Sequence, residues 1–223
     1  KQNDINTEYV HWKPNQKSPL SLAFLSENKD PEFLFYKDYT QQELYVNSPK
    51  INENDIVIFG SYYAINPAIR DKTKEILLLA KKNKAIIYYD PNFRNSHKNE
   101  ALKLNPIFIE NLEFADIVRG AAYDFQNMYE LTDAEKIYKD KVSFYCPNFI
   151  YTAGKKPIQL RTSSIHKSYQ PPAINPVSTI GAGDNFNAGI IYGLLKENIT
   201  LNELYDLSEE KWDRLINYAM LFS

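Results

Sequence analysis

The 223-residue sequence lacks several features that mark particular classes of protein. A single cysteine, Cys146, excludes a disulfide framework and favours a reducing, cytoplasmic compartment. No apolar run approaches the roughly 20 residues that span a bilayer, and the polar N-terminal stretch does not resemble a signal peptide. The 26 basic and 28 acidic residues leave a formal charge of −2. Neither nucleic acid nor a membrane is therefore expected as a partner.

Glycine is also scarce, with seven in the chain, yet three of them fall within nine residues. The stretch is STIGAGDNFNAG, residues 178–189, and apolar residues with helical spacing follow its turn. Gly181 and Gly183 permit backbone conformations and close approaches that a Cβ would prevent. The free N–H groups of the first helical turn would then form an anion site. The alternative is a tight turn in which Asp184 merely complements the helix dipole.

Two further glycines of this segment, Gly189 and Gly193, lie four residues apart inside the expected helix. Residues one helical turn apart share a face, so this spacing predicts close packing against another element. We therefore expect the helix that follows the glycine-rich turn to be held tightly in the body of the protein.

The rest of the chain alternates strand-like and helix-like segments, which is typical of a parallel α/β fold. Aromatic and β-branched residues alternate within 8–37 and predict a β-hairpin with a longer loop. Beyond it, strands are expected at 55–60, 84–90, 115–120 and 148–154, an edge strand at 158–162, and helices at 66–82, 99–112 and 123–130. A strand, a helix and a strand in that order predict parallel pairing. One α/β domain over 1–223 is the resulting expectation.

The glycine-rich stretch resembles the second signature of the ribokinase-like (PfkB) carbohydrate kinases, D-T-x-G-A-G-D-x-F-x-A-G. The resemblance implies a three-layer α/β/α fold with a mostly parallel central sheet and a small β-hairpin lid. It also implies that Asp184 is the general base for a sugar hydroxyl. The amides of Gly181, Ala182 and Gly183 would form the anion hole for the transferred phosphoryl group. Ser178 stands where the family often has Asp near a monovalent-cation site, so potassium activation stays open.

YDPNFR, residues 89–94, is similar to the D-x-N-x-R of the same family, at the end of a central strand. The resemblance implies that Arg94 and Asn92 contact substrate or phosphate, Arg94 as a bidentate cation. A surface salt bridge for Arg94 and a turn-forming role for Asp90 and Asn92 remain the alternatives.

ADIVRGAAYDF, residues 115–125, resembles the family's A-D-I-x-x-x-N-x-x-E-x, whose Glu helps to organise Mg²⁺ through water. Here Ala121 replaces the Asn and Asp124 replaces the Glu. Asp124 is therefore a candidate for a metal contact through water, at the position of that Glu.

Two further stretches imply contacts with ATP and with the sugar. YTAG resembles the T-x-G that precedes the nucleotide site, which implies that Thr152 and Gly154 lie near ATP. FLFYK resembles an aromatic lid strand that ends in Tyr-Arg in members with sugar-acid substrates, and Lys37 stands at the position of that Arg. A solvated lysine at a strand edge is the alternative for Lys37.

Taken over the whole chain, the resemblance lies with the fructokinase and 2-keto-3-deoxygluconokinase branch of the family. It implies an ATP- and Mg²⁺-dependent kinase acting on a primary hydroxyl of a sugar or sugar acid of the fructose, ribose or 2-keto-3-deoxygluconate class. A nucleoside kinase of the same fold and a non-catalytic carbohydrate- or nucleotide-binding relative stay open. Ala121 and Ser178 favour the non-catalytic relative, whereas the intact Asp184 with Gly181 and Gly183 opposes it. The expected partners are sugar, ATP and, through the apolar face of the hairpin, a second copy of the chain.

Family members also carry segments that this sequence lacks. These are a first strand with a sugar-binding Asp, a Gly-Gly loop, and later helices that close the adenine pocket. The chain is therefore expected to be part of a longer polypeptide, incomplete at both ends. The alternative is a trimmed chain that binds sugar poorly.

Overall fold

The computed structural model describes residues 3, 5–10, 20–25, 31–36, 48–174 and 178–223. The strands are β1 (Leu20–Leu25), β2 (Pro31–Tyr36), β3 (Ile56–Gly60), β4 (Ile86–Asp90), β5 (Ile117–Ala121), β6 (Asn148–Ala153), β7 (Lys156–Arg161) and β8 (His166–Tyr169). The α-helices are α1 (Ser61–Ile65), α2 (Arg70–Lys82), α3 (Ala101–Phe114), α4 (Ala122–Tyr129), α5 (Ala134–Ile137), α6 (Ala182–Lys196), α7 (Leu201–Leu204) and α8 (Glu209–Phe222). Short 3₁₀ turns, η1 (Pro67–Ile69) and η2 (Asn95–Glu100), precede α2 and α3.

The main sheet has six strands in the order β3-β4-β5-β6-β7-β8. The first four pair in parallel, as the alternation of strands and helices predicts. Strands β7 and β8 then add in antiparallel fashion. The strand expected at 158–162 is present as β7, but its predicted place at the edge of the sheet is wrong, because β8 pairs with the outer side of β7. The sequence of β8, HKSY, has two exposed residues and no apolar alternation, so it gives little strand signal.

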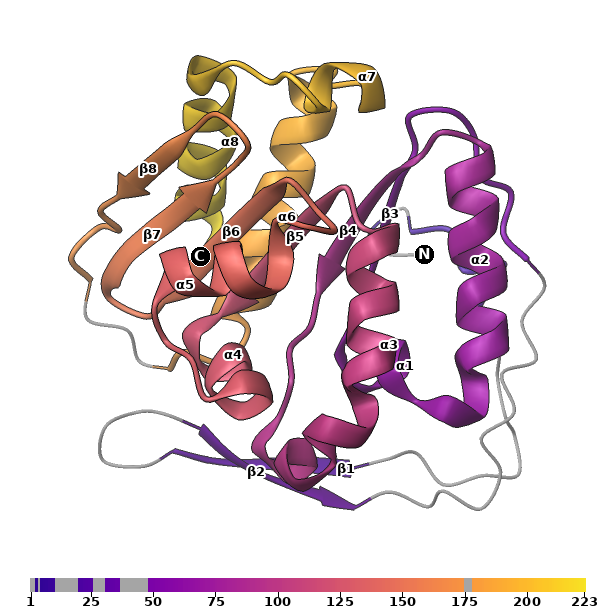
Figure 1. Ribbon diagram of the computed structural model, residues 1–223, viewed down its shortest axis with the longest axis vertical. Helices are drawn as coiled ribbons and strands as arrows, with labels where there is room; N and C mark the ends of the chain where they lie inside the picture. The colour runs from indigo at the N-terminus through magenta and orange to yellow at the C-terminus, as the bar shows by residue number, and fades with distance from the viewer. Residues whose placement is uncertain (1–2, 4, 11–19, 26–30, 37–47, 175–177) are drawn as a thin grey trace.

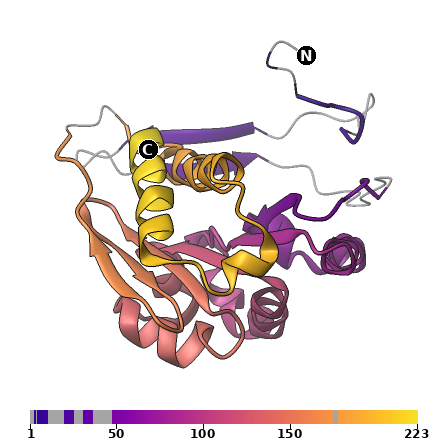
Figure 2. The ribbon, with the colours of Figure 1, turned by 90° about the horizontal axis from the view of Figure 1, so that it is seen from above.

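Helices cover both faces of the sheet and make three layers. In Figures 1 and 2, helices α2 to α5 lie on one face, and α6 and α8 lie on the other. Strand β4 is buried along its whole length because its side chains alternate between the two faces. Ile86 and Tyr88 pack under α6 and α8, whereas Ile87 and Tyr89 join the clusters on the opposite face. The predicted three-layer α/β/α fold is confirmed.

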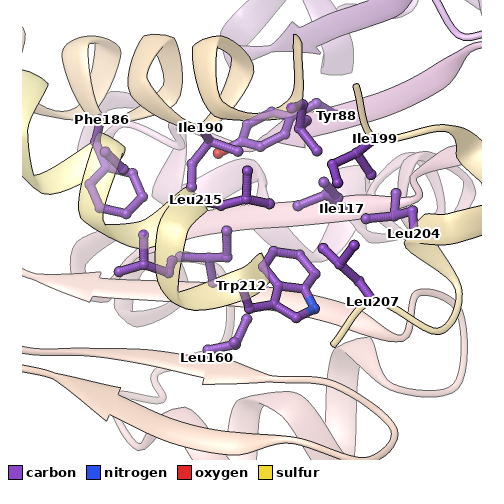
Figure 3. Close-up of a cluster of buried hydrophobic side chains, with 14 of the residues drawn as sticks. Tyr88, Ile117, Leu160, Phe186, Ile190, Ile199, Leu204, Leu207, Trp212 and Leu215 are labelled. Carbon is purple, nitrogen blue, oxygen red and sulfur yellow. The ribbon is translucent and has the colours of Figure 1, made fainter. Parts of the chain in front are cut away.

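The core between the sheet and the pair α6–α8 is the part of the fold that holds the glycine-rich segment in place (Figure 3). Trp212 and Leu215 of α8 pack there with Phe186 and Ile190 of α6, all nearly inaccessible to solvent. A Cβ added to Gly189 would lie 2.5 Å from the Cα of Ala219 on α8. The predicted close packing of this helix through its glycines is confirmed.

The hairpin of β1 and β2 is separate from the main sheet. Figure 1 places it beside the end of the body toward which the parallel strands run. Its described apolar side chains are exposed: Leu20, Leu22, Phe24, Leu34 and Tyr36. Within the described residues, no helix is long and apolar enough to cross a membrane.

Candidate active site

A cavity of ≈ 200 Å³ lies at the carboxyl ends of β4 and β5, against the first turn of α6. Ligands of open parallel sheets bind at this end because the loops and helix N-termini meet there. The cavity brings together six of the predicted site residues from three separate stretches: Asn92, Arg94, Asp124, Gly181, Gly183 and Asp184. Lys37 lies outside the described residues.

The first turn of α6 has the geometry of an anion site. Gly181 is its N-cap residue with a φ of 81°, a left-handed conformation that favours glycine. Within the turn, Ala182 donates its N–H to the Thr179 carbonyl oxygen at 3.2 Å, and Asn185 donates to the Gly181 carbonyl oxygen at 2.8 Å. No backbone bond within the described part of the chain takes up the N–H groups of Gly183 and Asp184. These two amides are thus the donors available at the positive end of the helix dipole.

The loop after β4 is shaped by Asp90, which is 6% exposed. Its Oδ1 accepts the N–H of Asn92 at 3.2 Å, an Asx turn in which Asn92 takes a φ of 41°. The turn-forming role considered for these two residues is therefore present in the structure. It directs the loop so that Arg94, two residues further on, lines the cavity with Asp184.

Asp124 ties the start of α4 to the same loop. Its Oδ1 accepts the N–H of Phe93 at 2.8 Å and its Oδ2 accepts the N–H of Ala121 at 2.7 Å. Burial, reinforced by the charge of Asp90, raises the pKa of Asp124 to about 7, against the lowering effect of the bond from Ala121. Both carboxyl oxygens of Asp124 are therefore already hydrogen-bonded to backbone N–H groups.

We expect the raised pKa of Asp124 to appear in the pH dependence of stability. Between pH 4 and pH 7 the folded protein holds a proton that the unfolded chain has lost, so stability falls as pH rises through this window. The expected fall due to Asp124 is on the order of 1–3 kcal/mol. Urea unfolding at several pH values should show a flatter profile for Asp124→Asn than for the parent. An unchanged slope would contradict the prediction.

Arg119 is a functional candidate that the sequence analysis does not identify. It lies on β5, lines the cavity and is 7% exposed. Its Nη1 donates to Asp90 Oδ2 at 3.1 Å and its Nη2 donates to Thr152 Oγ1 at 2.7 Å. The available signal is an arginine inside ADIVRG, since a charged residue in a strand buried on both faces requires a partner.

A second, larger cavity of ≈ 610 Å³ lies beside the first, and the two share Ala121 and Tyr123 in their walls. Thr152 and Gly154, which the resemblance assigns to the nucleotide, line this larger cavity. Gly154 has a φ of 58° in the turn between β6 and β7. The structure thus divides the predicted site residues between two adjoining cavities.

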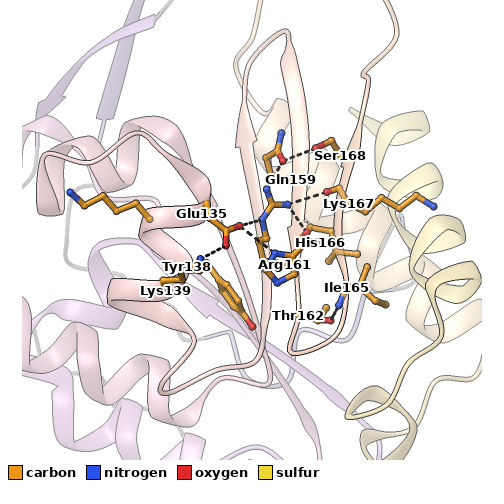
Figure 4. A network of polar contacts seen from close by, with 12 residues as sticks. Glu135, Tyr138, Lys139, Gln159, Arg161, Thr162, Ile165, His166, Lys167 and Ser168 are labelled. Carbon is orange, nitrogen blue, oxygen red and sulfur yellow. Dashed lines mark hydrogen bonds and ion pairs between the residues drawn. The ribbon is translucent and has the colours of Figure 1, made fainter.

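A polar network fixes one wall of the larger cavity (Figure 4). Glu135 accepts one hydrogen bond from Arg161 Nε at 2.7 Å and forms an ion pair with Lys139 at 3.1 Å. His166 Nδ1 lies 3.3 Å from the same carboxylate. The bonds from Arg161 and Lys139 lower the pKa of Glu135. Helix α5 is thereby tied to β7 and β8.

The oxygen atoms of the smaller cavity suit a hard cation that is bound mainly by the phosphates of a nucleotide. They suit less well a site in which protein side chains alone hold the metal ion. No group of three His, Cys, Asp or Glu side chains that could hold a metal ion occurs among the described residues. Asp184 nevertheless lines the cavity with an exposed carboxylate, the kind of ligand that Mg²⁺ prefers, whereas the carboxylates of Asp90 and Asp124 already accept hydrogen bonds. Mg²⁺ commonly keeps several waters and binds substrate phosphates, so one or two carboxylates suffice.

Comparisons with known proteins agree on the family. Residues 1–208 match the model of the pfkB family carbohydrate kinase. The chain is 22% identical to "Probable fructokinase-2" of Arabidopsis thaliana, over 98% of this chain and 67% of that protein. It is 26% identical to "Probable fructokinase-5" of Arabidopsis thaliana, over 94% of this chain and 66% of that protein.

A solved structure resembles the chain over nearly its whole length. The fructokinase of Vibrio cholerae O395 in its fructose-, ADP- and calcium-bound form superimposes with a TM-score of 0.77 at 18% identity, covering 98% of this chain and 68% of that one. The chain thus spans about two thirds of the length of the relatives it matches. The family match, the shared fold and the glycine-rich signature at the start of α6 lead to one conclusion: the chain belongs to the pfkB family of carbohydrate kinases.

Proposed function

We propose that the protein is an ATP-dependent kinase that transfers the γ-phosphoryl group to a primary hydroxyl of a sugar of the fructose class. The observation that carries the proposal is the smaller cavity, where the glycine turn of α6, Asp184 and Arg94 face a common space. Phosphoryl transfer requires positioning, charge neutralisation and a base, and this set of residues can supply all three. The names of the relatives, and the fructose and ADP bound to a structural neighbour, support the choice of substrates.

In the proposed reaction, the sugar hydroxyl oxygen bonds to the γ-phosphorus as the bond from that phosphorus to the β–γ bridging oxygen breaks. Asp184 accepts the hydroxyl proton, and ADP leaves with the bond electrons. The amides of Gly181, Gly183 and Asp184 are proposed as the anion hole, and those of Gly183 and Asp184 have no backbone partner within the described residues. The amide of Ala182, expected in this set, instead donates to the Thr179 carbonyl oxygen. Arg94 would neutralise charge on substrate or phosphate, and Asn92 would support it.

The larger cavity is proposed to hold part of the nucleotide, beside Thr152 and Gly154. Its volume lies in the range of ligand pockets, and its shared wall with the smaller cavity allows phosphates to extend toward α6. Mg²⁺ is proposed to accompany ATP, with Asp124 at most a contact through water. When bound, the ion would neutralise phosphate charge.

The experiment that tests this function is ATP consumption by the purified protein against fructose, ribose, 2-keto-3-deoxygluconate and adenosine. The expected result is ADP release that depends on fructose and on Mg²⁺. Release with adenosine instead would favour a nucleoside kinase. Binding of ATP without turnover on any acceptor would favour a non-catalytic relative and contradict the proposal.

We also propose that residues 1–223 act as one kinase domain in which the hairpin within 8–37 is a lid over the sugar. Its separation from the main sheet and its place near the carboxyl ends of the strands support a covering role. Its exposed apolar residues would otherwise face water as a patch of the kind that marks an interaction site. A second copy of the chain is the proposed partner of this face.

For this dimer, the expected result is loss of association when the apolar face is charged. Leu22 and Leu34 are direct cross-strand partners in the middle of the hairpin and are both exposed. The double variant Leu22→Glu/Leu34→Glu should be a monomer by multi-angle light scattering, whereas the parent should be a dimer. Leu102→Glu, at a 91% exposed position of α3, is the matched control and should remain a dimer. A monomeric parent would contradict the dimer.

A further inference from the structure

Five buried or half-buried side chains form a continuous line of hydrogen bonds that connects the wall of the smaller cavity to the wall of the larger one. Tyr88 donates its hydroxyl to Asn187 Oδ1 at 2.9 Å, and Asn187 Nδ2 donates to Asp90 Oδ2 at 2.6 Å. Arg119 donates to the same Asp90 oxygen at 3.1 Å and to Thr152 Oγ1 at 2.7 Å. This line, called here the polar chain, connects β4, β5, β6 and α6.

One end of the polar chain reaches the helix that carries the proposed base. Asn187 lies on α6 three residues after Asp184, hence about one turn further along the helix. Its side chain is buried, and its bonds to Tyr88 and Asp90 fix the rotation and depth of this turn against β4. The other end, Thr152, lines the larger cavity.

Arg119 also contacts the first turn of α6 directly. A Cβ on Gly183 would lie 3.1 Å from Arg119 Nη1, so glycine at this position lets the guanidinium pack against the turn. The guanidinium carbon lies 5.7 Å from the centre of the Phe186 ring. Arg119 is thus held between the sheet and the residues on either side of Asp184.

The arrangement is poorly explained by stability alone. A buried ion pair gains little over well-packed apolar residues, because both charges must be desolvated. Burial lowers the pKa of Arg119, but Asp90 and the other acidic groups nearby, Tyr88 and Asp124, together outweigh burial, so the pKa lies above its ordinary value. Arg119 Nε is buried and has no hydrogen-bond partner among the described residues. A buried donor without a partner costs free energy, so a benefit other than stability is indicated.

We infer that Arg119 is a positioning residue for phosphoryl transfer: it sets the first turn of α6, and with it Asp184, relative to the ends of β4 and β6. The inference rests on the proposed function, since it assigns Arg119 a role through the proposed base. Small displacements of a reacting group cost large factors in rate, which gives such a residue a measurable effect.

The test compares Arg119→Lys and Arg119→Met with a control ion pair. Lysine keeps the charge beside Asp90, but its single ammonium cannot reproduce the two-pronged contact with Asp90 and Thr152. Methionine removes both the charge and the two hydrogen bonds, and it leaves Asp90 buried without its charge partner. If the methionine variant does not fold, the lysine variant decides the outcome. Arg70→Met is the control, because Arg70 pairs with Glu110 at 2.6 Å on the outer helices and lines neither cavity.

The kinetic readout is a double-mutant cycle with Asp184→Asn. Arg119→Lys should lower kcat at least about tenfold and change KM for ATP less than about threefold, whereas Arg70→Met should leave kcat within about twofold. In the Asp184→Asn background, Arg119→Lys should lower kcat by less than about threefold, because the base that Arg119 positions has already been removed. An equal loss in both backgrounds, or an unchanged kcat in the folded variant, would overturn the inference.

A second readout does not depend on activity. Amide hydrogen exchange at residues 185–188 of α6 should be at least about tenfold faster in Arg119→Lys, with α2 unchanged. Arg70→Met should instead speed exchange in α2 and leave exchange at residues 185–188 of α6 unchanged. Unchanged exchange in α6 would overturn the inference even if the protein has no kinase activity, whereas a parent without phosphoryl transfer would overturn the proposed function alone.

Discussion

Asp184→Asn is expected to lower kcat by about 10²–10⁴-fold, the usual cost of removing a general base. The substitution keeps the size of the side chain and removes the charge that would take the proton of the sugar hydroxyl. KM for ATP should change little, because the first-turn amides of α6 that are proposed to hold phosphate remain in place. Steady-state kinetics at saturating fructose, with ATP varied, measures both constants.

The matched control for this variant is Asp71→Asn. Asp71 is an exposed carboxylate in the first turn of α2, so it has the same relation to a helix dipole and lines neither cavity. It should alter stability slightly and leave kcat unchanged. If Asp184→Asn behaves in the same way, with kcat within a few fold of the parent, Asp184 only complements the helix dipole and the proposed mechanism is wrong.

Trp212→Ala is expected to lower the free energy of unfolding by about 3–5 kcal/mol, the range typical of large aromatic residues replaced in a core. Trp212 is 1% exposed and lies in the cluster that joins α8 to α6 and the sheet (Figure 3). Its removal leaves a cavity that these rigid elements fill only in part.

Urea unfolding followed by circular dichroism measures this loss. Leu221→Ala, on the same helix at a position that is 81% exposed, is the control and should change the free energy of unfolding by less than about 0.5 kcal/mol. A loss below about 1 kcal/mol for Trp212→Ala would mean that the packing of α8 contributes little to stability.

Strands buried on both faces were predictable from short apolar runs, and β4 is the clearest case because all five of its residues are buried. Strand β8 was not, because its pairing with β7 depends on backbone bonds rather than on apolar side chains. Helix α8 is missing from the expected elements although its signals are plain. Ser208 caps it, and Trp212, Leu215, Ile216 and Ala219 recur with helical spacing.

The gathering of Arg94, Asp124 and Asp184 in one cavity was predictable from their places at strand ends and at a helix start. The place of Arg119 was not, because its partners depend on strand register. The pairing of Tyr89 with Val118 sets Asp90 beside Arg119. Local sequence patterns do not determine which residues of two strands pair with each other.

The packing of α8 on the sheet also has a consequence for the folding pathway. β3, α2 and β4 form a unit of nearby residues, whereas the Trp212 cluster joins α8 to Tyr88 and Ile117, roughly a hundred residues away along the chain. Closing such long loops costs entropy before the contacts repay it, so nearby pairings form sooner. We therefore expect the sheet to gain its first parallel strands early and the Asp184 turn to reach its final place among the last steps of folding.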